Sequence, residues 1–330
     1  MVVPRRALVP RRALAALAAA AALPGAAPAQ EGFPSRPVAL IAAGAEGGPT
    51  DTLARVLAGA MGPRLGQPIA VEAVGPPHAA AQRLVRMRPD GHTLLLANVG
   101  LAASATLFRH LPYEVPGSFA PLGLVSETAM TLVARPGFPA KDLAGYMEAL
   151  RSGGDKLSFA TAGPGGAANL CALLVQAAVG ARAKAVMFRG TAPAIAAVVA
   201  ARTDLLCDQA TNTAPYIRDG RVQAYAVTGR ERLPGLPGLP TTAEAGFPAV
   251  AMEAWHGLFA PAGTPEPAQE AVAAALRGAL GDERLRARFA ELLTEPAPEE
   301  RATPAFHRRF LAEEVERWRP VVQAVGAYAD

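Results

Sequence analysis

The chain has 330 residues, a formal net charge of +4 and only two cysteines. Four of its 32 basic side chains lie in the first twelve residues, and without these four the basic side chains equal the 28 acidic ones in number. A chain that is neutral beyond its first residues lacks the basic surface of a nucleic-acid-binding protein, so we expect no nucleic-acid partner.

Residues 1–29 have the pattern of a secretory signal peptide. Arginines at positions 5, 6, 11 and 12 form a basic head, and the apolar run Ala13–Leu23 that follows is too short to span a bilayer. Ala27-Pro28-Ala29 supplies the small residues of a cleavage site. We expect cleavage near Ala29 and a periplasmic product, and the sequence leaves open whether export uses the general secretion or the twin-arginine route. A tethered amphipathic helix is disfavoured, because no charged face recurs within the apolar run.

From Val38 onward, apolar strand patterns alternate with helical ones. The predicted strands are Val38–Ala43, Ile69–Ala73 and Thr93–Ala97, and the helices between them are Thr52–Leu65 and Ala79–Met87. Such alternation is typical of a parallel sheet that is covered by helices on both faces.

The same alternation restarts after Pro136. Its predicted elements, in the order helix, strand, helix, strand, helix, strand, strand, are Leu143–Leu150, Leu157–Ala162, Ala167–Val179, Ala185–Phe188, Ala192–Ala201, Asp204–Cys207 and Val222–Thr228. A second parallel sheet is therefore expected.

Two long extended runs, Leu122–Ala134 and Val250–Ala260, predict two crossings between the sheets. The helical tail, Glu266–Leu293 and Thr303–Val325, should return to the first lobe. We therefore expect an α/β protein of two lobes on a strand hinge, each lobe a mainly parallel sheet flanked by helices. The first lobe would comprise residues 30–127 and 255–330, and the second, inserted lobe residues 128–254.

Two glycine-rich turns each lie between a predicted strand and a predicted helix. They are Gly44–Asp51 and Gly163–Gly166. A helix start exposes backbone N–H groups that have no partner within the helix, and it carries the positive end of the helix dipole. Two such turns could hold an anionic ligand from both sides of a cleft.

Enzymatic functions find little support in the sequence. Gly163-x-Gly165-x-x-Ala168 matches a loose dinucleotide-binding pattern, but the following strand region, residues 186–190, lacks the usual acidic residue. Its arginine could suit a 2′-phosphate, so the motif stays open. The stronger objection is export, since pyridine nucleotides are scarce outside the cytoplasm. The chain has no Gly-x-Ser-x-Gly sequence, and its five histidines do not have metal-ligand spacing. We expect no catalytic residue, metal or cofactor, and we expect His92 and His307 on the solvated surface.

Several side chains have two possible roles. Cys171 and Cys207 lie in apolar contexts, which favours two buried thiols over a disulfide bond in an exported protein. Asp208 follows an apolar strand, where it could face a ligand cleft or cap the next turn. Asp51 could bind a ligand donor, but compensation of the helix dipole is slightly favoured.

The chain resembles the periplasmic receptors of the tripartite tricarboxylate transporter system, the Bug family, from Phe33 to its C-terminus. The sequence blocks that carry the resemblance are Phe33-Pro34-Ser35-Arg36-Pro37, Gly47-Gly48-Pro49-Thr50-Asp51, Leu65-Gly66-Gln67-Pro68, Pro89-Asp90-Gly91-His92-Thr93-Leu94-Leu95, Leu111-Pro112-Tyr113, Phe188-Arg189-Gly190-Thr191-Ala192-Pro193-Ala194, Leu239-Pro240-Thr241-Thr242-Ala243-Glu244-Ala245-Gly246 and Ala260-Pro261-Ala262-Gly263-Thr264-Pro265.

The resemblance implies a type II-like Venus flytrap that closes over a small, carboxylate-bearing solute and presents it to transporter subunits in the membrane. It implies a receptor rather than an enzyme, and we expect a monomer. The implied ligand-binding residues are Gly44, Ala45, Glu46, Gly47, Gly48, Thr50, Asp51, Asn98, Thr161, Ala162, Gly163, Gly165, Gly166, Asn169 and Asp208. A ligand sensor that signals to a histidine kinase is the main alternative, and a secreted amidase or esterase is a more distant one.

The first glycine turn departs from the family pattern. Gly44 stands where relatives usually carry an aromatic residue, and Glu46 stands where they carry proline. In the second turn, Gly166 and Asn169 replace a frequent serine and histidine. A negative charge beside an anion site would repel a carboxylate, so we hypothesise a ligand that is amphoteric or only weakly anionic. Alternatively, Glu46 points to solvent and has no effect.

Overall fold

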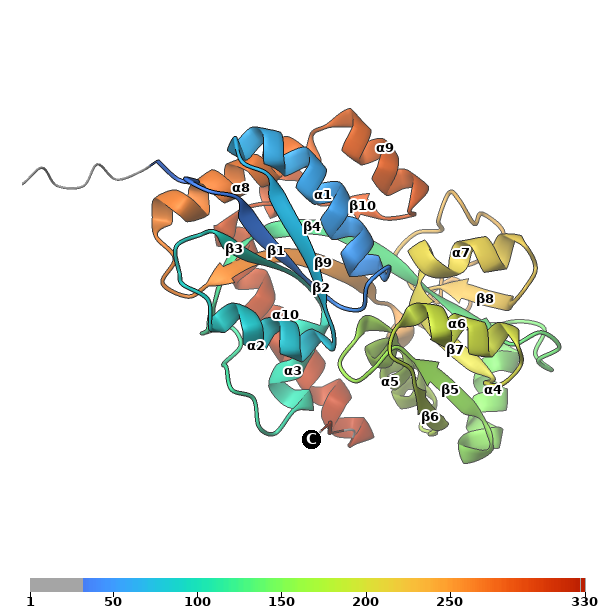
Figure 1. Ribbon diagram of the computed structural model, residues 1–330. Coiled ribbons are helices and arrows are strands. Elements are labelled where there is room, and N and C mark those ends of the chain that lie inside the picture. The colour runs from blue at the N-terminus through green and yellow to red at the C-terminus, as the bar shows by residue number, and fades with distance from the viewer. Residues whose placement is uncertain (1–31, 327, 330) are drawn as a thin grey trace, which may run out of the picture. The chain divides into compact units, whose positions relative to one another are not determined.

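The computed structural model describes residues 32–326, 328 and 329, and the elements below lie within the unit Phe33–Asp330 (Figure 1). The predicted signal peptide lies outside the described residues. Among the residues that are described, no helix combines the length and the apolar character needed to cross a membrane.

The described strands form one continuous ten-stranded sheet, and its first half is parallel, as predicted. Its strands are β1 (Val38–Ala43), β2 (Ile69–Val74) and β3 (Thr93–Asn98), and β1 pairs with both of the others. Helices α1 (Pro49–Leu65) and α2 (Pro77–Val85) connect them. Helix α1 begins three residues before the predicted start, because Pro49 suits the first helical position, where no N–H group is needed.

The second half repeats this arrangement. Strands β5 (Ser158–Thr161), β6 (Lys184–Met187) and β7 (Leu205–Gln209) are parallel, with β5 in the middle. Helices α4 (Leu143–Gly153), α5 (Ala167–Val179), α6 (Thr191–Val199) and α7 (Ala210–Arg218) accompany these strands. Below, "first lobe" means β1–β3 with α1, α2 and α3 (Gly100–Leu107), and "second lobe" means β5–β7 with α4–α7.

Two long antiparallel strands join the halves. They are β4 (Phe119–Ala134) and β9 (Glu253–Pro261), and they complete the order β2-β1-β3-β9-β4-β7-β5-β6. The short strands β8 (Gln223–Val227) and β10 (Glu295–Pro296) also pair with β4. In Figure 1, β4 runs from the first lobe on the left to the second lobe on the right.

The tail is helical, as predicted, but it is divided. Asp282 caps a new helix with its carboxylate, which separates α8 (Glu266–Leu280) from α9 (Glu283–Glu291). The last helix, α10 (Pro304–Val325), packs against α3 and β4. The single turns η1 (Gly154–Lys156), η2 (Pro248–Val250) and η3 (Glu299–Arg301) complete the described elements.

The expected surface position of His307 is wrong. Its side chain has no exposed surface, its Nδ1 accepts a hydrogen bond of 3.1 Å from the Gly123 N–H, and burial lowers its pKa to about 3. The imidazole lies over Gly257 of β9, where any larger residue would overlap it. The charged neighbours of His307 in the sequence concealed that it lies on the apolar face of α10.

The two cysteines are bonded, which contradicts the prediction of two separate thiols. Cys171 of α5 and Cys207 of β7 form a disulfide with their Cα atoms 5.9 Å apart. Because β7 is next to β5 and α5 packs against β7, the two side chains meet in the interior. Apolar sequence surroundings are shared by buried thiols and buried disulfides, so they could not separate the two.

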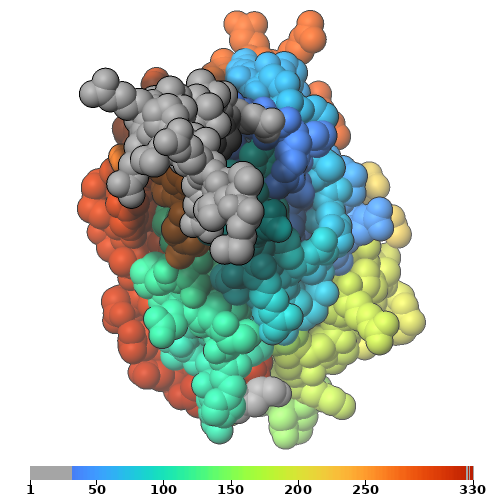
Figure 2. Space-filling model, turned by 60° about the vertical axis from the view of Figure 1, so that its left-hand side comes forward, coloured from blue at the N-terminus to red at the C-terminus, as the bar shows by residue number. Residues whose placement is uncertain are grey.

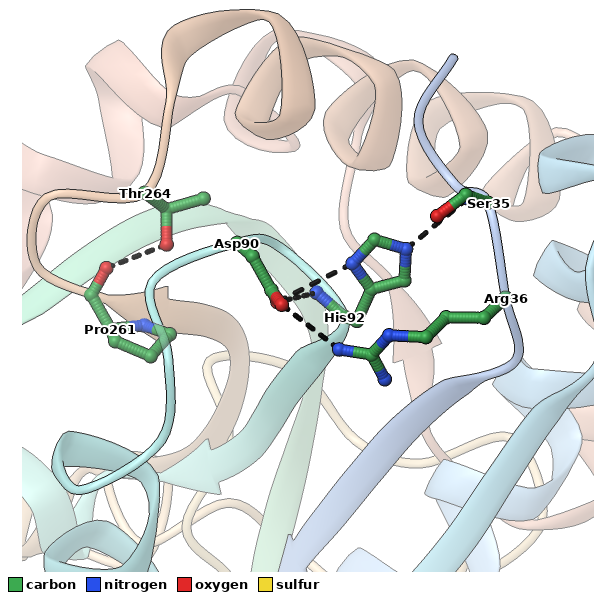
Figure 3. A network of polar contacts seen from close by, with 6 residues as sticks. All are labelled: Ser35, Arg36, Asp90, His92, Pro261 and Thr264. Atoms are coloured by element: carbon green, nitrogen blue, oxygen red, sulfur yellow. Dashed lines mark hydrogen bonds and ion pairs between the residues drawn. The ribbon is translucent and has the colours of Figure 1, made fainter. Parts of the chain in front are cut away.

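Two of the sequence blocks that carry the family resemblance, Phe33–Pro37 and Pro89–Leu95, meet at the amino ends of β1 and β3 (Figure 3). Arg36 pairs with Asp90 at 2.9 Å, and the Ser35 N–H donates to His92 Nε2. The Asp90 carboxylate also accepts from the His92 N–H. His92 is therefore buried, contrary to its expected surface position, and this network fixes the start of the fold.

Candidate functional site

A cavity of about 670 Å³ lies at the carboxyl ends of the parallel strands. Ala43, Gly75 and Asn98 line it where the three first-lobe strands end, and Ala162, Met187 and Asp208 line it from the ends of β5, β6 and β7. In α/β sheets this edge is where ligands bind. On the face of the molecule shown in Figure 2, the blue and teal surface of the first lobe meets the yellow-green surface of the second.

Several helices begin at the cavity wall. Gly48–Thr50 at the start of α1, Gly166–Ala168 at the start of α5, and Gly190 and Thr191 at the start of α6 all line the cavity. In α1 the first intrahelical donor is Thr52 N, and in α5 it is Leu170 N. The earlier N–H groups therefore have no acceptor within their helix, and with the helix dipoles they make the cavity favourable for an anion.

The two glycine turns have the same internal brace. Gly47 and Gly165 have φ values of +70° and +74°, which favour glycine. Asp51 Oδ2 accepts from the Gly47 N–H at 2.9 Å, and Asn169 Oδ1 accepts from the Gly165 N–H at 3.1 Å. These two N–H groups are thus used to fix the turns, and Asp51 and Asn169 lie behind the cavity wall.

The structure brings most of the predicted ligand-binding residues together. Those that line the cavity are Gly44, Ala45, Gly48, Thr50, Asn98, Ala162, Gly163, Gly166 and Asp208. Those that lie outside its lining are Glu46, Gly47, Asp51, Thr161, Gly165 and Asn169. That any of them contacts a ligand stays a prediction.

Glu46 is exposed, and its charge interacts with Arg55. This position favours the alternative in which Glu46 faces solvent. The hypothesis of a weakly anionic ligand assumed that the Glu46 carboxylate lies close to the bound anion and repels it. The exposed position of Glu46 does not support that assumption.

Sequence reasoning missed part of the wall. Pro76 and Pro77 from the turn after β2, Phe188 and Arg189 after β6, and Gln209 also line the cavity. The rule that parallel strands share one carboxyl edge could have found them, since it applies to β2 and β6 as much as to the strands before the glycine turns. Arg189 and Asp208 are the ionisable side chains among the lining residues that the structure describes.

A buried polar chain connects the hinge strands to the start of α1. Ser126 of β4 is 3.3 Å from His256 Nδ1, and His256 Nε2 is 3.3 Å from the Thr50 hydroxyl. Asn98 Nδ2 donates to the same hydroxyl at 3.4 Å. Burial lowers the pKa of His256 to about 3, so the ring is neutral at physiological pH and offers one donor and one acceptor. The network holds Thr50 at the cavity wall.

Asp208 is a buried carboxyl group at the end of β7, with only 2% of its surface exposed. Its Oδ1 accepts from the Gln209 N–H at 2.7 Å and from Asn212 Nδ2 at 3.3 Å. Its Oδ2 has no partner with hydrogen-bond geometry among the described residues, although the Thr191 hydroxyl also favours the charged form. Burial outweighs these contacts and raises the pKa of Asp208 to about 6.

A family model described as the tripartite tricarboxylate transporter family receptor matches residues 53–327. A UPF0065 protein of Agrobacterium vitis, from the TAR-I ttuE-ttuC' intergenic region, is 38% identical over 300 residues, which are 90% of this chain and 87% of the relative.

Two solved structures are similar over nearly the whole described unit. The periplasmic binding protein BugD is 35% identical with a TM-score of 0.84, and the match covers 90% of this chain and 100% of BugD. MatC from Rhodopseudomonas palustris, solved with bound malate, is 39% identical with a TM-score of 0.82, covering 88% of this chain and 100% of MatC.

Proposed function

Since the chain belongs to the tripartite tricarboxylate transporter receptor family, the Bug periplasmic receptors, we propose that it binds a small organic carboxylate in the cavity between its lobes. The observation that carries this proposal is the set of helix starts at one cavity wall, with α1 from the first lobe and α5 and α6 from the second. Their N–H groups and dipoles can hold a carboxylate without a cluster of cationic side chains. The malate bound to MatC supports the same ligand class.

The proposal includes export and delivery. The protein would lose residues 1–29, act in the periplasm and present its solute to transporter subunits in the membrane. No chemical conversion of the solute is proposed.

The lobes would move about β4 and β9. The proposed boundaries, 127/128 and 254/255, face each other in the ladder, where Glu127 pairs with Trp255 and Thr128 with Ala254. Such a hinge lets a ligand favour closure, provided that it binds the closed form more tightly than the open one.

A thermal-shift screen of residues 30–330 against carboxylic acids tests the proposal. Because the cavity volume falls in the range of pockets that hold drug-sized ligands, the panel should extend from four-carbon dicarboxylates to aromatic acids. A ligand at about 100 times its Kd adds about 2.7 kcal/mol. The midpoint should then rise by several degrees, at roughly 2–4 °C per kcal/mol for a chain of this size. A flat response across the panel would overturn the proposal.

A further inference from the structure

Asp208 is a buried acid in a cavity otherwise suited to anions. Its Oδ2 belongs to a cavity-lining residue and has no hydrogen-bond partner among the residues that the structure describes. Buried polar groups are normally paired, and a buried carboxylate that lacks a partner is costly. The Oδ2 atom itself has almost no exposed surface, so the protein leaves one strong acceptor unsatisfied directly behind the cavity surface.

The groups around Asp208 do not supply the missing partner. From its own segment, Gln209 N and Asn212 occupy Oδ1, and from β4 the Thr131 hydroxyl donates to the Asp208 backbone carbonyl. The Thr191 hydroxyl of α6 lies near enough to favour the charged form of Asp208, but it does not reach Oδ2 with hydrogen-bond geometry. The other charged group of the wall, Arg189, is exposed, and it is not among the described groups that influence the Asp208 carboxyl.

We propose that Asp208 selects solutes that carry a hydroxyl or ammonium donor in addition to their carboxylate. This inference rests on the proposed function, because the helix starts would hold the carboxylate while the second group of the solute donates to Oδ2. An analogue without that donor would leave Oδ2 buried and unpaired. Sites built around such a hydrogen bond reject analogues that lack it far more strongly than apolar pockets reject a missing methylene.

Succinate, malate and aspartate form a matched set for the test, since they share two carboxylates and differ in having no donor, a hydroxyl or an ammonium. Isothermal titration calorimetry at pH 8 should give malate or aspartate a Kd about tenfold to a hundredfold below that of succinate, as expected for a hydrogen bond to a charged group. The tighter of the two identifies the donor.

The Asp208→Asn variant keeps the shape of the side chain and removes its charge. It should bring the three dissociation constants to within about threefold of one another. Asp219→Asn is the control, because this exposed aspartate at the end of α7 lies outside the cavity lining and the same chemical change there should preserve the preference. Thermal melting of each variant establishes that it is folded.

The preference should also depend on pH. Burial raises the pKa of Asp208 to about 6, so at pH 5.5 much of the carboxyl is protonated and Oδ2 no longer acts as a free charged acceptor. The advantage of malate or aspartate should therefore shrink between pH 8 and pH 5.5. The pH response of Asp208→Asn measures the titration of the ligands themselves, which can be subtracted.

The outcomes separate the two proposals. Equal binding of all three solutes to the unmodified protein, or an unchanged preference in Asp208→Asn, would overturn this inference and leave the proposed function standing. No binding of these solutes together with no response to any other panel acid would overturn both.

Discussion

Asp51 and Asn169 have the same task in the two glycine turns. Each accepts a hydrogen bond from the N–H of a glycine four residues earlier, and each is nearly buried behind the cavity wall. Asp51 also accepts from Arg55 Nε. The first turn is therefore fixed by a charged acceptor and the second by a neutral one.

Removing the Asp51 brace should destabilise the protein. Asp51→Ala loses hydrogen bonds to a buried carboxylate, so the free energy of unfolding should fall by about 1.5–3 kcal/mol. Arg55→Ala is the matched control: its side chain is 52% exposed, so breaking the same ion pair from that side should cost clearly less than Asp51→Ala, since exposed ion pairs contribute little to stability. Urea unfolding measures both, and equal losses would show that the ion pair rather than the brace matters.

His307 should make stability depend on pH. Its pKa is lowered to about 3 in the folded protein, whereas an unfolded histidine titrates near 6.5. The unfolded state therefore binds more protons between these values, and stability falls as the pH drops. From pH 6.5 to 5.5 the loss is about 1 kcal/mol.

His307→Asn keeps an acceptor for the Gly123 N–H but does not titrate. In urea unfolding its stability should fall less steeply between pH 6.5 and 5.5 than that of the unmodified protein. The two proteins are compared at each pH, because Asp208 has the opposite effect on stability. Its pKa is raised in the folded protein, so its contribution to the free energy of unfolding increases as the pH falls. If the free energy of unfolding fell equally steeply with pH in both proteins, His307 would not be the source of the pH dependence.

At the scale of elements, the disulfide links the helix of one glycine turn to the strand that carries Asp208. Cys171 lies in the second turn of α5, whose start lines the cavity, and Cys207 is adjacent to Asp208 on β7. The bond therefore fixes two parts of the second-lobe wall relative to each other.

Replacing both cysteines by alanine should lower the free energy of unfolding by about 2–4 kcal/mol, the range expected for a bond that closes a loop between residues 36 positions apart. The unmodified protein in reducing agent should behave like the variant. A variant as stable as the oxidised protein would contradict this prediction.

At the scale of the whole molecule, the two lobes approach each other at glycines. A Cβ on Gly190 of the second lobe would be 3.0 Å from the Ala45 Cβ. A Cβ on Gly100, at the start of α3, would overlap the carbonyl oxygen of Gly165. The arrangement described here thus requires the absence of a side chain at Gly100.

Gly100→Ala should hold the lobes apart and weaken ligand binding by about tenfold or more, while the protein remains folded, because the arrangement in which Gly100 meets Gly165 becomes less favourable. Gly59→Ala is the control, since a Cβ there meets nothing within 4 Å and alanine favours the interior of α1. Calorimetric titration measures the affinity, and small-angle X-ray scattering measures compaction by ligand. If Gly100→Ala bound the ligand with unchanged affinity, binding would not require the absence of a side chain at position 100.

Much of the architecture was predictable because its signals are local. Buried strands such as Val38–Ala43 and helices such as Ala167–Val179 were placed at their observed bounds from periodicity alone. Helices α3 and α7 were missed because they are short and begin directly after strands, without an intervening turn sequence that would indicate the start of a helix. The disulfide and the buried His307 depend on contacts between distant segments, which no local pattern encodes.

The candidate site was predicted from its two glycine turns, and the ends of β2 and β6 were overlooked. The turns carry a recognisable composition, whereas Pro76 and Phe188 gain meaning only from the shared edge of a folded sheet. Residues that brace the turns, Asp51 and Asn169, could not be distinguished from cavity-lining ones, because both kinds occupy the same short stretch of sequence.

The network of Ser35, Arg36, Asp90 and His92 has a consequence for comparing this chain with its relatives. These residues lie at the amino ends of β1 and β3, opposite the strand ends that line the cavity, and they are absent from its lining. Part of the overall identity therefore reflects shared framework, whereas other blocks that carry the resemblance, such as Gly47–Asp51, contribute to the cavity wall. Grouping relatives by the residues at the positions equivalent to Gly44, Arg189 and Asp208, which line the cavity, should group them by the solutes that they bind.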